Sequence, residues 1–489
     1  MALLAGAVSA IEVPGTAGRI DAGGYVDGLA IVKTQSSPRQ RPQGLANLRL
    51  DALARDWLRG HLELRGRIGG PFEGGHADVY NFVHTFQNYS PAGELSEAYA
   101  DLRFQRADVR IGVQKAAWGK LDGVPPTDVL NPRDYHDPLV QDFEEAKIGV
   151  PAVLGSYYLP DLPRAALSQL RATLVYVPIA VPSRLPLLAE RWFPPTIVDV
   201  SQLTVSRELQ MQAGLDFGRD ITIPVAFDTA NHRTPVSFDT GGIAFRLGGT
   251  WYETDWDIYH YTGPETGPDV DLLAEVALDA STPEHPIQAQ AVLRQAHDVI
   301  HMTGFDWSAA FGPASVRAEA AFFQGHSYLR AAEDLVSEEA LAELPLETIG
   351  DELRQNGRAA VPLGDLFVPL DSVEWGIGVD CLVRGFLPLL QLNQTVLLER
   401  APRLLISDPE TRLTGVLRRS FMQERLELEL RSAYAIERES WMVFPRVSYL
   451  LRDDLRVRLG YLALGGPTVS MIGQYRNNDE VVIQARYSF

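Results

Sequence analysis

Charged side chains alternate with apolar or small ones in several stretches of this chain, and these charges are the groups best able to act on another molecule. Between residues 57 and 69, Arg59, His61, Glu63, Arg65 and Arg67 are each separated by one apolar or small residue. Side chains two residues apart on a β-strand point to the same face, so the five would share one face, opposite Leu58, Leu62 and Leu64. A face of this kind can attract or repel ions and polar solutes by charge.

The same alternation recurs at 98–105, 109–114, 316–322, 373–383, 424–434 and 455–463. If the strands close around water, the residues expected to line the interior are Arg49, Asp51, Arg59, His61, Glu63, Arg65, Arg67, Asp101, Arg103, Arg110, Arg317, Glu319, Glu427, Glu429 and Arg431. Charged faces also occur in half-solvated soluble sheets. The connections between strands must therefore be used to distinguish a soluble sheet from a barrel around water.

Catalytic and metal-binding patterns are scarce in the sequence. It contains no G-x-S-x-G, no H-E-x-x-H and no phosphate-binding glycine loop. The 10 histidines lack metal-ligand spacing, and Cys381 is the single cysteine. We therefore expect no enzyme, no cofactor and no metal centre, apart from loosely bound Ca²⁺ or Mg²⁺ at the acidic stretch 331–353. A formal charge of −19 argues against nucleic acid as a partner.

The connections alternate between short and long along the chain. Short polar turns lie near 54–56, 105–107, 312–313, 422–423 and 452–454, whereas the long irregular segments are 70–93, 118–147, 179–240, 264–292 and 327–370. Outer-membrane barrels alternate short periplasmic turns with long outer loops in this way. The sequence contains no run of about 18 apolar residues that would form a membrane helix.

We predict an all-β fold, namely a single closed antiparallel transmembrane β-barrel of about 18 strands, with 16 as the alternative. The expected strands are 19–33, 44–54, 57–69, 94–105, 108–117, 148–158, 166–178, 241–251, 255–263, 293–305, 314–326, 372–384, 387–399, 411–420, 424–436, 439–451, 455–465 and 480–489. The segments 179–240, 264–292 and 327–370 are expected to be long outer loops, with short helices around 202–216 and within 331–353.

The two ends of the sequence support an exported barrel. Residues 480–489 alternate in period two and finish on Tyr487-Ser488-Phe489, so Tyr487 and Phe489 are expected on the strand that closes the barrel. The apolar run 2–10 ends in small residues and is expected to be the stub of a signal peptide, which leaves 11–489 as the barrel. Both termini are then expected in the periplasm.

One long connection carries a distinctive motif. Trp118-Gly119 and Asp122 are followed by the run Asp128-Val129-Leu130-Asn131-Pro132-Arg133-Asp134. Its glycines and prolines prevent a long helix or strand, and its acids can cap turns or pair with arginine. We expect 118–147 to fold inward and narrow the pore. The candidate constriction residues are Trp118, Asp122, Asp128, Asn131, Arg133 and Asp134. The alternative is that these residues only hold the loop in place and contact no solute.

This motif resembles a little-characterised family of Gram-negative outer-membrane β-barrels with a W-G-x-x-D…D-x-x-N-P-R-D segment, distantly similar to alginate-export porins. The resemblance is strong over about 40 residues and implies location and architecture more firmly than substrate. The expected function is an outer-membrane, porin-like channel for an unidentified solute. The alternatives are a scaffold or secretion partner for another envelope protein, and a surface-exposed enzyme. Expected partners are outer-membrane lipid, lipopolysaccharide and the barrel-assembly machinery.

Overall fold

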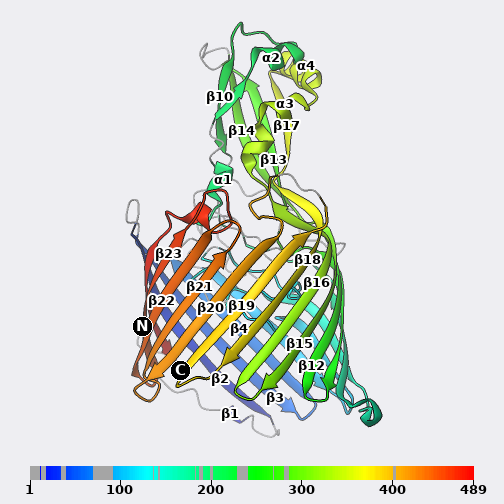
Figure 1. The fold of residues 1–489 in the computed structure, drawn as a ribbon, viewed down its shortest axis with the longest axis vertical. Coiled ribbons are helices and arrows are strands. Elements are labelled where there is room, and N and C mark those ends of the chain that lie inside the picture. Colours follow the sequence, from blue (N-terminus) through cyan, green and yellow to red (C-terminus); the bar gives the residue numbers. More distant parts are fainter. Residues whose placement is uncertain are drawn as a thin grey trace.

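The computed structural model describes residues 11–12, 18–34, 40–69, 92–135, 137–140, 144–181, 183–184, 186, 191–198, 202–227, 241–267, 269–279, 286–399 and 403–489. Figure 1 shows tilted strands forming a barrel, with a smaller unit of strands and helices above one rim. None of the described helices is long and apolar enough to cross a membrane. The expected signal stub at 1–10 lies outside the described residues.

Eighteen antiparallel strands close the barrel, which confirms the predicted fold class and strand number. In order around the wall they are β2 (Arg19–Lys33), β3 (Gln40–Arg55), β4 (Leu58–Gly69), β5 (Ala92–Arg103), β6 (Ala107–Gln114), β7 (Val150–Tyr158), β8 (Leu167–Val177), β11 (Gly242–Trp251), β12 (Thr254–Pro264), β15 (Val299–Phe311), β16 (Ala314–Leu329), β18 (Phe367–Cys381), β19 (Phe386–Leu397), β20 (Glu410–Phe421), β21 (Leu426–Ala435), β22 (Ser440–Arg452), β23 (Leu455–Gly465) and β24 (Glu480–Ser488).

The barrel closes where β24 pairs with β2. The register joins Tyr487 to Val26 and Glu480 to Lys33. The last residue is also held, because the Phe489 N–H donates to the Gly24 carbonyl at 2.9 Å and the Gly24 N–H donates to a Phe489 carbonyl oxygen at 3.0 Å. A two-residue strand, β1 (Ile11–Glu12), adds to the same β2. Closure leaves no free sheet edge in the wall, and a free edge would present unpaired backbone groups.

The wall is apolar on its outside, whereas its inner face carries charged side chains on some strands and, from β7 to β16, buried apolar ones that pack against Trp118, Leu130 and Ile148. Leu390, Leu459 and Ile483 point outward and are 53 %, 52 % and 45 % exposed. Exposed apolar side chains on this scale are not expected in a wall that faces water on both sides. The strand register places the fifteen charged residues predicted for the interior on the opposite face of β3 to β6, β16 and β21, where cross-strand pairs include Asp51 with His61 and Arg418 with Glu429.

The long connections above the barrel form a second sheet, which the sequence analysis did not predict. Its order is β17 (Arg358–Asp365), β13 (Asp269–Leu278), β14 (Ile287–Ala296), β10 (Ile221–Phe227) and β9 (Gln202–Val205). The segments 179–240, 264–292 and 327–370 are therefore not simply irregular loops, and the predicted barrel strand 293–305 is wrong at its start. Residues 287–296 belong to β14, and the barrel strand begins at Val299.

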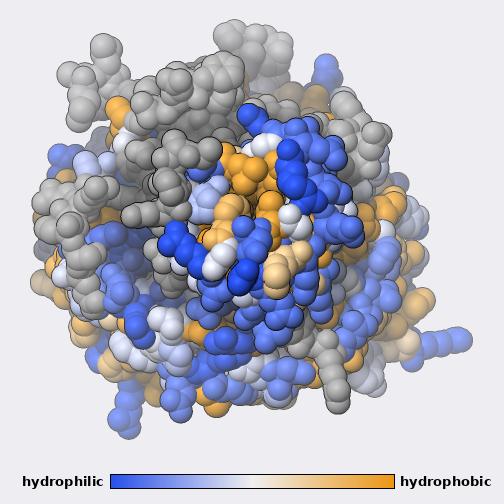
Figure 2. Space-filling model, turned by 90° about the horizontal axis from the view of Figure 1, so that it is seen from above, coloured by the Kyte–Doolittle hydropathy of each residue, from blue (hydrophilic) through white to orange (hydrophobic). Residues whose placement is uncertain are grey.

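Helices cover this second sheet, in the regions where short helices are predicted. They are α2 (Arg207–Gln212), α3 (Glu338–Ala342) and α4 (Leu346–Asn356), together with the 3₁₀ turn Ala332–Val336, whereas α1 (Pro195–Val198) and the 3₁₀ turns Pro163–Ala165 and Gly473–Tyr475 lie elsewhere. Ile349 and Leu353 of α4 pack against Ile221 and Val276 of the sheet. Seen from above, this unit shows apolar residues gathered at its centre within a hydrophilic rim (Figure 2).

Candidate functional site: a segment that crosses the barrel interior

The segment between β6 and β7, residues 115–149, enters the barrel and contacts opposite walls. Counted from β2 around the ring, β4 is third and β18 is twelfth, so they lie nine places apart in a ring of eighteen. At one end of the segment, Asp134 binds Arg67 of β4 at 2.9 Å. At the other end, Leu121 lies against the backbone of Gly376 in β18. The segment therefore spans the interior from wall to wall.

One carboxylate of the wall anchors the first part of the segment. Glu319 of β16 is 2 % exposed and accepts hydrogen bonds from three backbone N–H groups, those of Lys120 at 3.0 Å, Leu121 at 3.2 Å and Thr127 at 2.7 Å. The Thr127 hydroxyl donates a fourth bond at 2.6 Å. Hydrogen bonds to a charged acceptor are stronger than neutral ones, so Glu319 fixes the turn 120–127 against the wall.

Glycines make room for this docking on both sides. A methyl group added at Gly376 would lie 2.7 Å from Leu121 Cδ1, and one added at Gly304 of β15 would lie 2.5 Å from Thr127 Cγ2. On the segment, Gly119 has φ +82, and a Cβ there would lie 2.8 Å from Glu319 Oε1. Only glycine adopts this backbone conformation at low cost and leaves space for the carboxylate. This explains the glycine of the Trp-Gly pair.

Lysine 120 extends the anchor into a buried charge cluster. Its Nζ lies 2.7 Å from Asp306 Oδ1 of β15 and 3.3 Å from Asp257 Oδ2 of β12. Arg246 of β11 binds the same Asp257 at 2.7 Å, and the Tyr259 hydroxyl donates to Asp306 at 2.5 Å. The two carboxylates are thus balanced by two cations and one phenol. Trp118 is buried beside this cluster, with its ring 5.0 Å from that of Tyr259.

The second part of the segment is held by its own polar side chains. Asn131 is 2 % exposed; its Oδ1 accepts from the Ala116 N–H at 2.7 Å, and its Nδ2 donates to the Ile148 carbonyl at 2.9 Å. It thereby joins the start of the segment to its end. Asp128 pairs with Arg133 at 2.8 Å and with Lys147 at 2.9 Å. Burial raises the pKa of Asp128, while the two cations oppose that shift.

Asp134 belongs to a buried group of four charges that fixes the far end. Arg67 binds it at 2.9 Å, and Arg184 lies 3.5 Å from the same oxygen. Arg184 also binds Glu94 of β5 at 3.0 Å. All four residues are at most 9 % exposed. Arg67 also lies 3.8 Å from Glu94, so two cations and two carboxylates balance one another in this group.

The six residues predicted for a constriction therefore fall into two groups. Trp118, Asp128, Asn131 and Asp134 are buried and make the packing and pairing contacts that hold the segment. Asp122 is different, because its side chain is 50 % exposed and its carboxylate binds Arg317 of β16. Arg133 is 19 % exposed while it pairs with Asp128. Asp122 and Arg133 are thus the two members that can meet a solute, and their role in a constriction stays a prediction.

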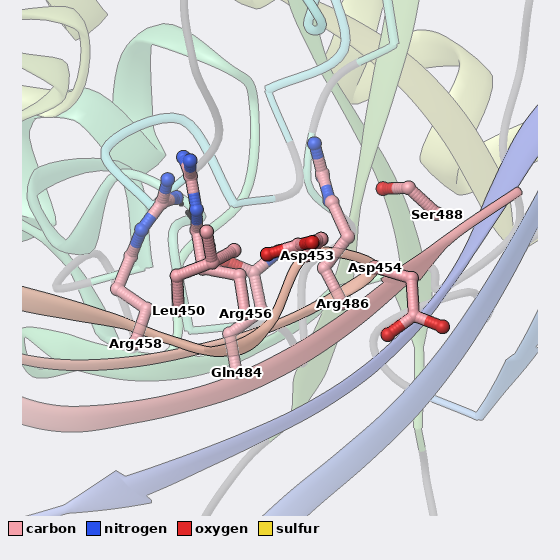
Figure 3. A pocket seen from close by; sticks show the side chains of 8 residues that line it. All are labelled: Leu450, Asp453, Asp454, Arg456, Arg458, Gln484, Arg486 and Ser488. Carbon is pink, nitrogen blue, oxygen red and sulfur yellow. Dashed lines mark hydrogen bonds between the residues drawn. The ribbon is translucent and has the colours of Figure 1, made fainter. Parts of the chain in front are cut away.

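Arginines gather on the wall at the lower end of the interior. A cavity of about 280 Å³ is lined by Leu450, Asp453, Asp454, Arg456, Arg458, Gln484, Arg486 and Ser488. Figure 3 shows the side chains of Arg456, Arg458 and Arg486 reaching from β23 and β24 to the same side of the sheet. Arg486 pairs with Asp27 at 2.6 Å and Glu145 at 3.0 Å, whereas Arg458 bonds to the neutral Ser448 and Gln484.

Several of these residues were not predicted from the sequence. Lys120, Asp257, Asp306 and the arginines of the last two strands were not among the predicted site residues. Asp257 and Asp306 do lie in period-two stretches, and so do Arg456 and Arg458, so the alternation alone could have placed them inside. The pairing of Lys120 with Asp306 had no such signal, because it joins residues far apart in sequence.

Fold and site together define a closed β-barrel with a charged interior that is crossed by one folded segment. No family model matches the chain, and no curated protein matches it. Solved structures that resemble it include OpdL of Pseudomonas aeruginosa, at 10 % identity and a TM-score of 0.46 over 96 % of this chain and 98 % of that one. OccAB3 of Acinetobacter baumannii has 8 % identity and a TM-score of 0.46 over 96 % and 99 %. OpdK of Pseudomonas aeruginosa has 9 % identity and a TM-score of 0.46 over 96 % and 98 %.

Proposed function

We propose that the protein is a passive, porin-like channel for a small hydrophilic solute. The observation that carries the proposal is the exposure of charged side chains within the interior. Arg49 and Asp51 are 59 % and 41 % exposed on the wall, and Asp122 is 50 % exposed on the crossing segment. A barrel filled by a dry core would bury such groups, so water reaches the segment from at least one opening.

The apolar outer wall supports insertion in a bilayer, and a closed barrel satisfies the backbone groups that hydrocarbon cannot. We infer an outer-membrane location, with both termini in the periplasm and the second sheet outside the cell. Lipid, lipopolysaccharide and the barrel-assembly machinery are the inferred partners. The acidic helices α3 and α4 would be the place for loosely bound Ca²⁺ or Mg²⁺.

Planar-bilayer recording of the purified protein tests the channel. We expect discrete conductance steps that scale with salt concentration, because ions would pass through a water-filled interior. The matched control is the same protein after heat unfolding, which should give no steps. A folded, inserted barrel without conductance would contradict the proposal and would favour the alternative of a scaffold or secretion partner.

Arg456, Arg458 and Arg486, the arginines that line the cavity at the lower end of the interior, should set the ion preference of this channel. Changing Arg456→Glu and Arg458→Glu together replaces two positive charges by two negative ones beside the cavity, so anion entry becomes unfavourable. We expect the reversal potential under a salt gradient to shift toward cation preference. The comparison variant is Arg19→Glu. Arg19 is the first residue of β2 and pairs with Asp21 at 2.7 Å, and its replacement should shift the reversal potential less. An equal shift in the two variants would show that these arginines have no special role.

A charge on the outer wall tests the inferred membrane face. Leu430 is 39 % exposed near the middle of β21. Leu430→Arg should destabilise the inserted barrel by about 2–4 kcal/mol, because arginine near the bilayer midplane is poorly solvated. Thr414→Arg on the neighbouring β20 faces the interior and is the control. Urea unfolding in lipid vesicles, followed by gel mobility without heating, measures both. Equal stability of the two variants would mean that the faces are assigned wrongly.

A further inference from the structure

Three side chains that can bind a metal converge on the inner wall, at a place the sequence analysis left without a metal role. His61 and Glu63 of β4 and Glu97 of β5 each offer one ligand atom, and the three atoms lie within 4.8 Å of one another. The pairing register explains the convergence, since Glu63 is opposite Glu97 and His61 is two residues along the same face. We propose that this cluster is a binding site for a divalent transition-metal ion, and that Zn²⁺ is the ion it binds best.

The histidine is oriented as a metal ligand would be. His61 Nδ1 lies 2.7 Å from Asp51 Oδ1 on the adjacent β3. When Nδ1–H donates to this carboxylate, Nε2 keeps its lone pair free for a metal. Metal-binding histidines regularly have a carboxylate behind them in this way, which fixes the ring and makes the ligating nitrogen more basic. Stacking of the ring on Tyr99, with centroids 4.9 Å apart, fixes it further.

The two carboxylates are also positioned through one oxygen each. Glu63 Oε1 accepts from Asn47 Nδ2 at 2.9 Å and from Arg65 Nε at 3.0 Å. Glu97 Oε1 accepts from the Lys115 backbone N–H at 2.9 Å. These hydrogen bonds engage one oxygen of each carboxylate, so the other oxygen can turn toward a metal. Arg65 and Lys115 add positive charge beside the site, and this lowers the affinity that the ligands alone would give.

The ligand types favour zinc over the alkaline-earth ions. One imidazole nitrogen with two carboxylate oxygens suits Zn²⁺ or a similar transition metal, whereas Ca²⁺ and Mg²⁺ prefer oxygen alone. Ligand bonds of about 2.0–2.2 Å in a tetrahedral site place ligand atoms roughly 3.4 Å apart. Rotations of the two glutamate side chains would bring the ligand atoms from their present spacing, which is within 4.8 Å, to this separation. A water from the interior would complete the site, and the 8 % and 15 % exposure of His61 and Glu63 leaves an approach for the ion.

Isothermal titration of the purified, detergent-solubilised barrel with Zn²⁺ tests this site without reference to conductance. We expect one zinc ion per chain, with binding unaffected by an excess of Ca²⁺. The double variant His61→Ala with Glu97→Gln should lose it. Asp51→Asn keeps all three ligands and should weaken affinity about 10- to 100-fold, as loss of an orienting carboxylate does.

The control removes histidines that lie outside this cluster. His260 and His301 are on the outward face, where both bond to Thr262. His260→Ala with His301→Ala should leave the stoichiometry and affinity unchanged. Gel mobility without heating shows for each variant whether the barrel is folded. The proposal is overturned if folded wild type binds no Zn²⁺, or if the His61/Glu97 double variant binds it as the parent does. A conducting channel that binds no zinc would remove this site and leave the proposed function intact.

Discussion

Replacing Glu319 by alanine is expected to increase single-channel conductance more than any other single substitution in the interior. This carboxylate accepts four hydrogen bonds from Lys120, Leu121 and Thr127, and each bond to a charged group contributes about 1.5–3 kcal/mol. Losing them leaves three backbone N–H groups without their acceptor. The turn 120–127 should then detach from the wall and widen the passage. Deleting 120–130 should produce the limiting, fully open value.

Two comparison variants separate release of the segment from a simple loss of charge. Glu319→Gln keeps an acceptor of nearly the same shape and should give an intermediate conductance. Glu427→Gln removes a carboxylate of β21 that lies 4.0 Å from Arg418 of the wall, so it should leave the passage nearly unchanged. If Glu319→Ala and the deletion both conduct like the parent, the segment does not limit the flow of ions.

The largest loss of stability is expected from the buried charges at the other end of the segment. Arg67→Ala removes the 2.9 Å ion pair of Asp134 and keeps its 3.5 Å contact with Arg184, an arginine that is shared with Glu94. Removing one partner of a buried ion pair typically costs 3–5 kcal/mol, because the remaining charge is poorly solvated. We expect the midpoint of urea unfolding to fall accordingly, and the region 128–149 to become accessible to protease before the barrel unfolds.

An exposed pair is the matched control for this experiment. Arg19 and Asp21 lie 2.7 Å apart with side chains 59 % and 47 % exposed. Ion pairs in water contribute little, so Arg19→Ala should hardly move the unfolding midpoint. The buried cluster would be energetically unimportant if both alanine variants unfolded at the same urea concentration.

The sequence alone determined the wall of this protein. Apart from the start of the strand at Val299, the positions of the barrel strands and the C-terminal closing strand follow from period-two alternation, which depends only on neighbouring residues. The chain from Leu426 to Ala435 shows why, since the large apolar side chains Leu426, Leu428, Leu430 and Tyr434 face outward, while Glu427, Glu429 and Arg431 face inward along one continuous strand. The turns between such strands are short and polar, so the positions of the turns could also be predicted from the sequence.

Tertiary structure decided what happens inside and above that wall. Glu319 meets Thr127 across 192 positions of the chain, and no local pattern encodes this contact. The second sheet pairs β13 with β17 and β10 with β14, from three separate connections, so each segment alone looked like a loop. The grouping of His61 and Glu63 with Glu97 depends on the register between β4 and β5. Periodicity fixes which face a side chain takes, but only the closed barrel fixes which other side chains it meets there.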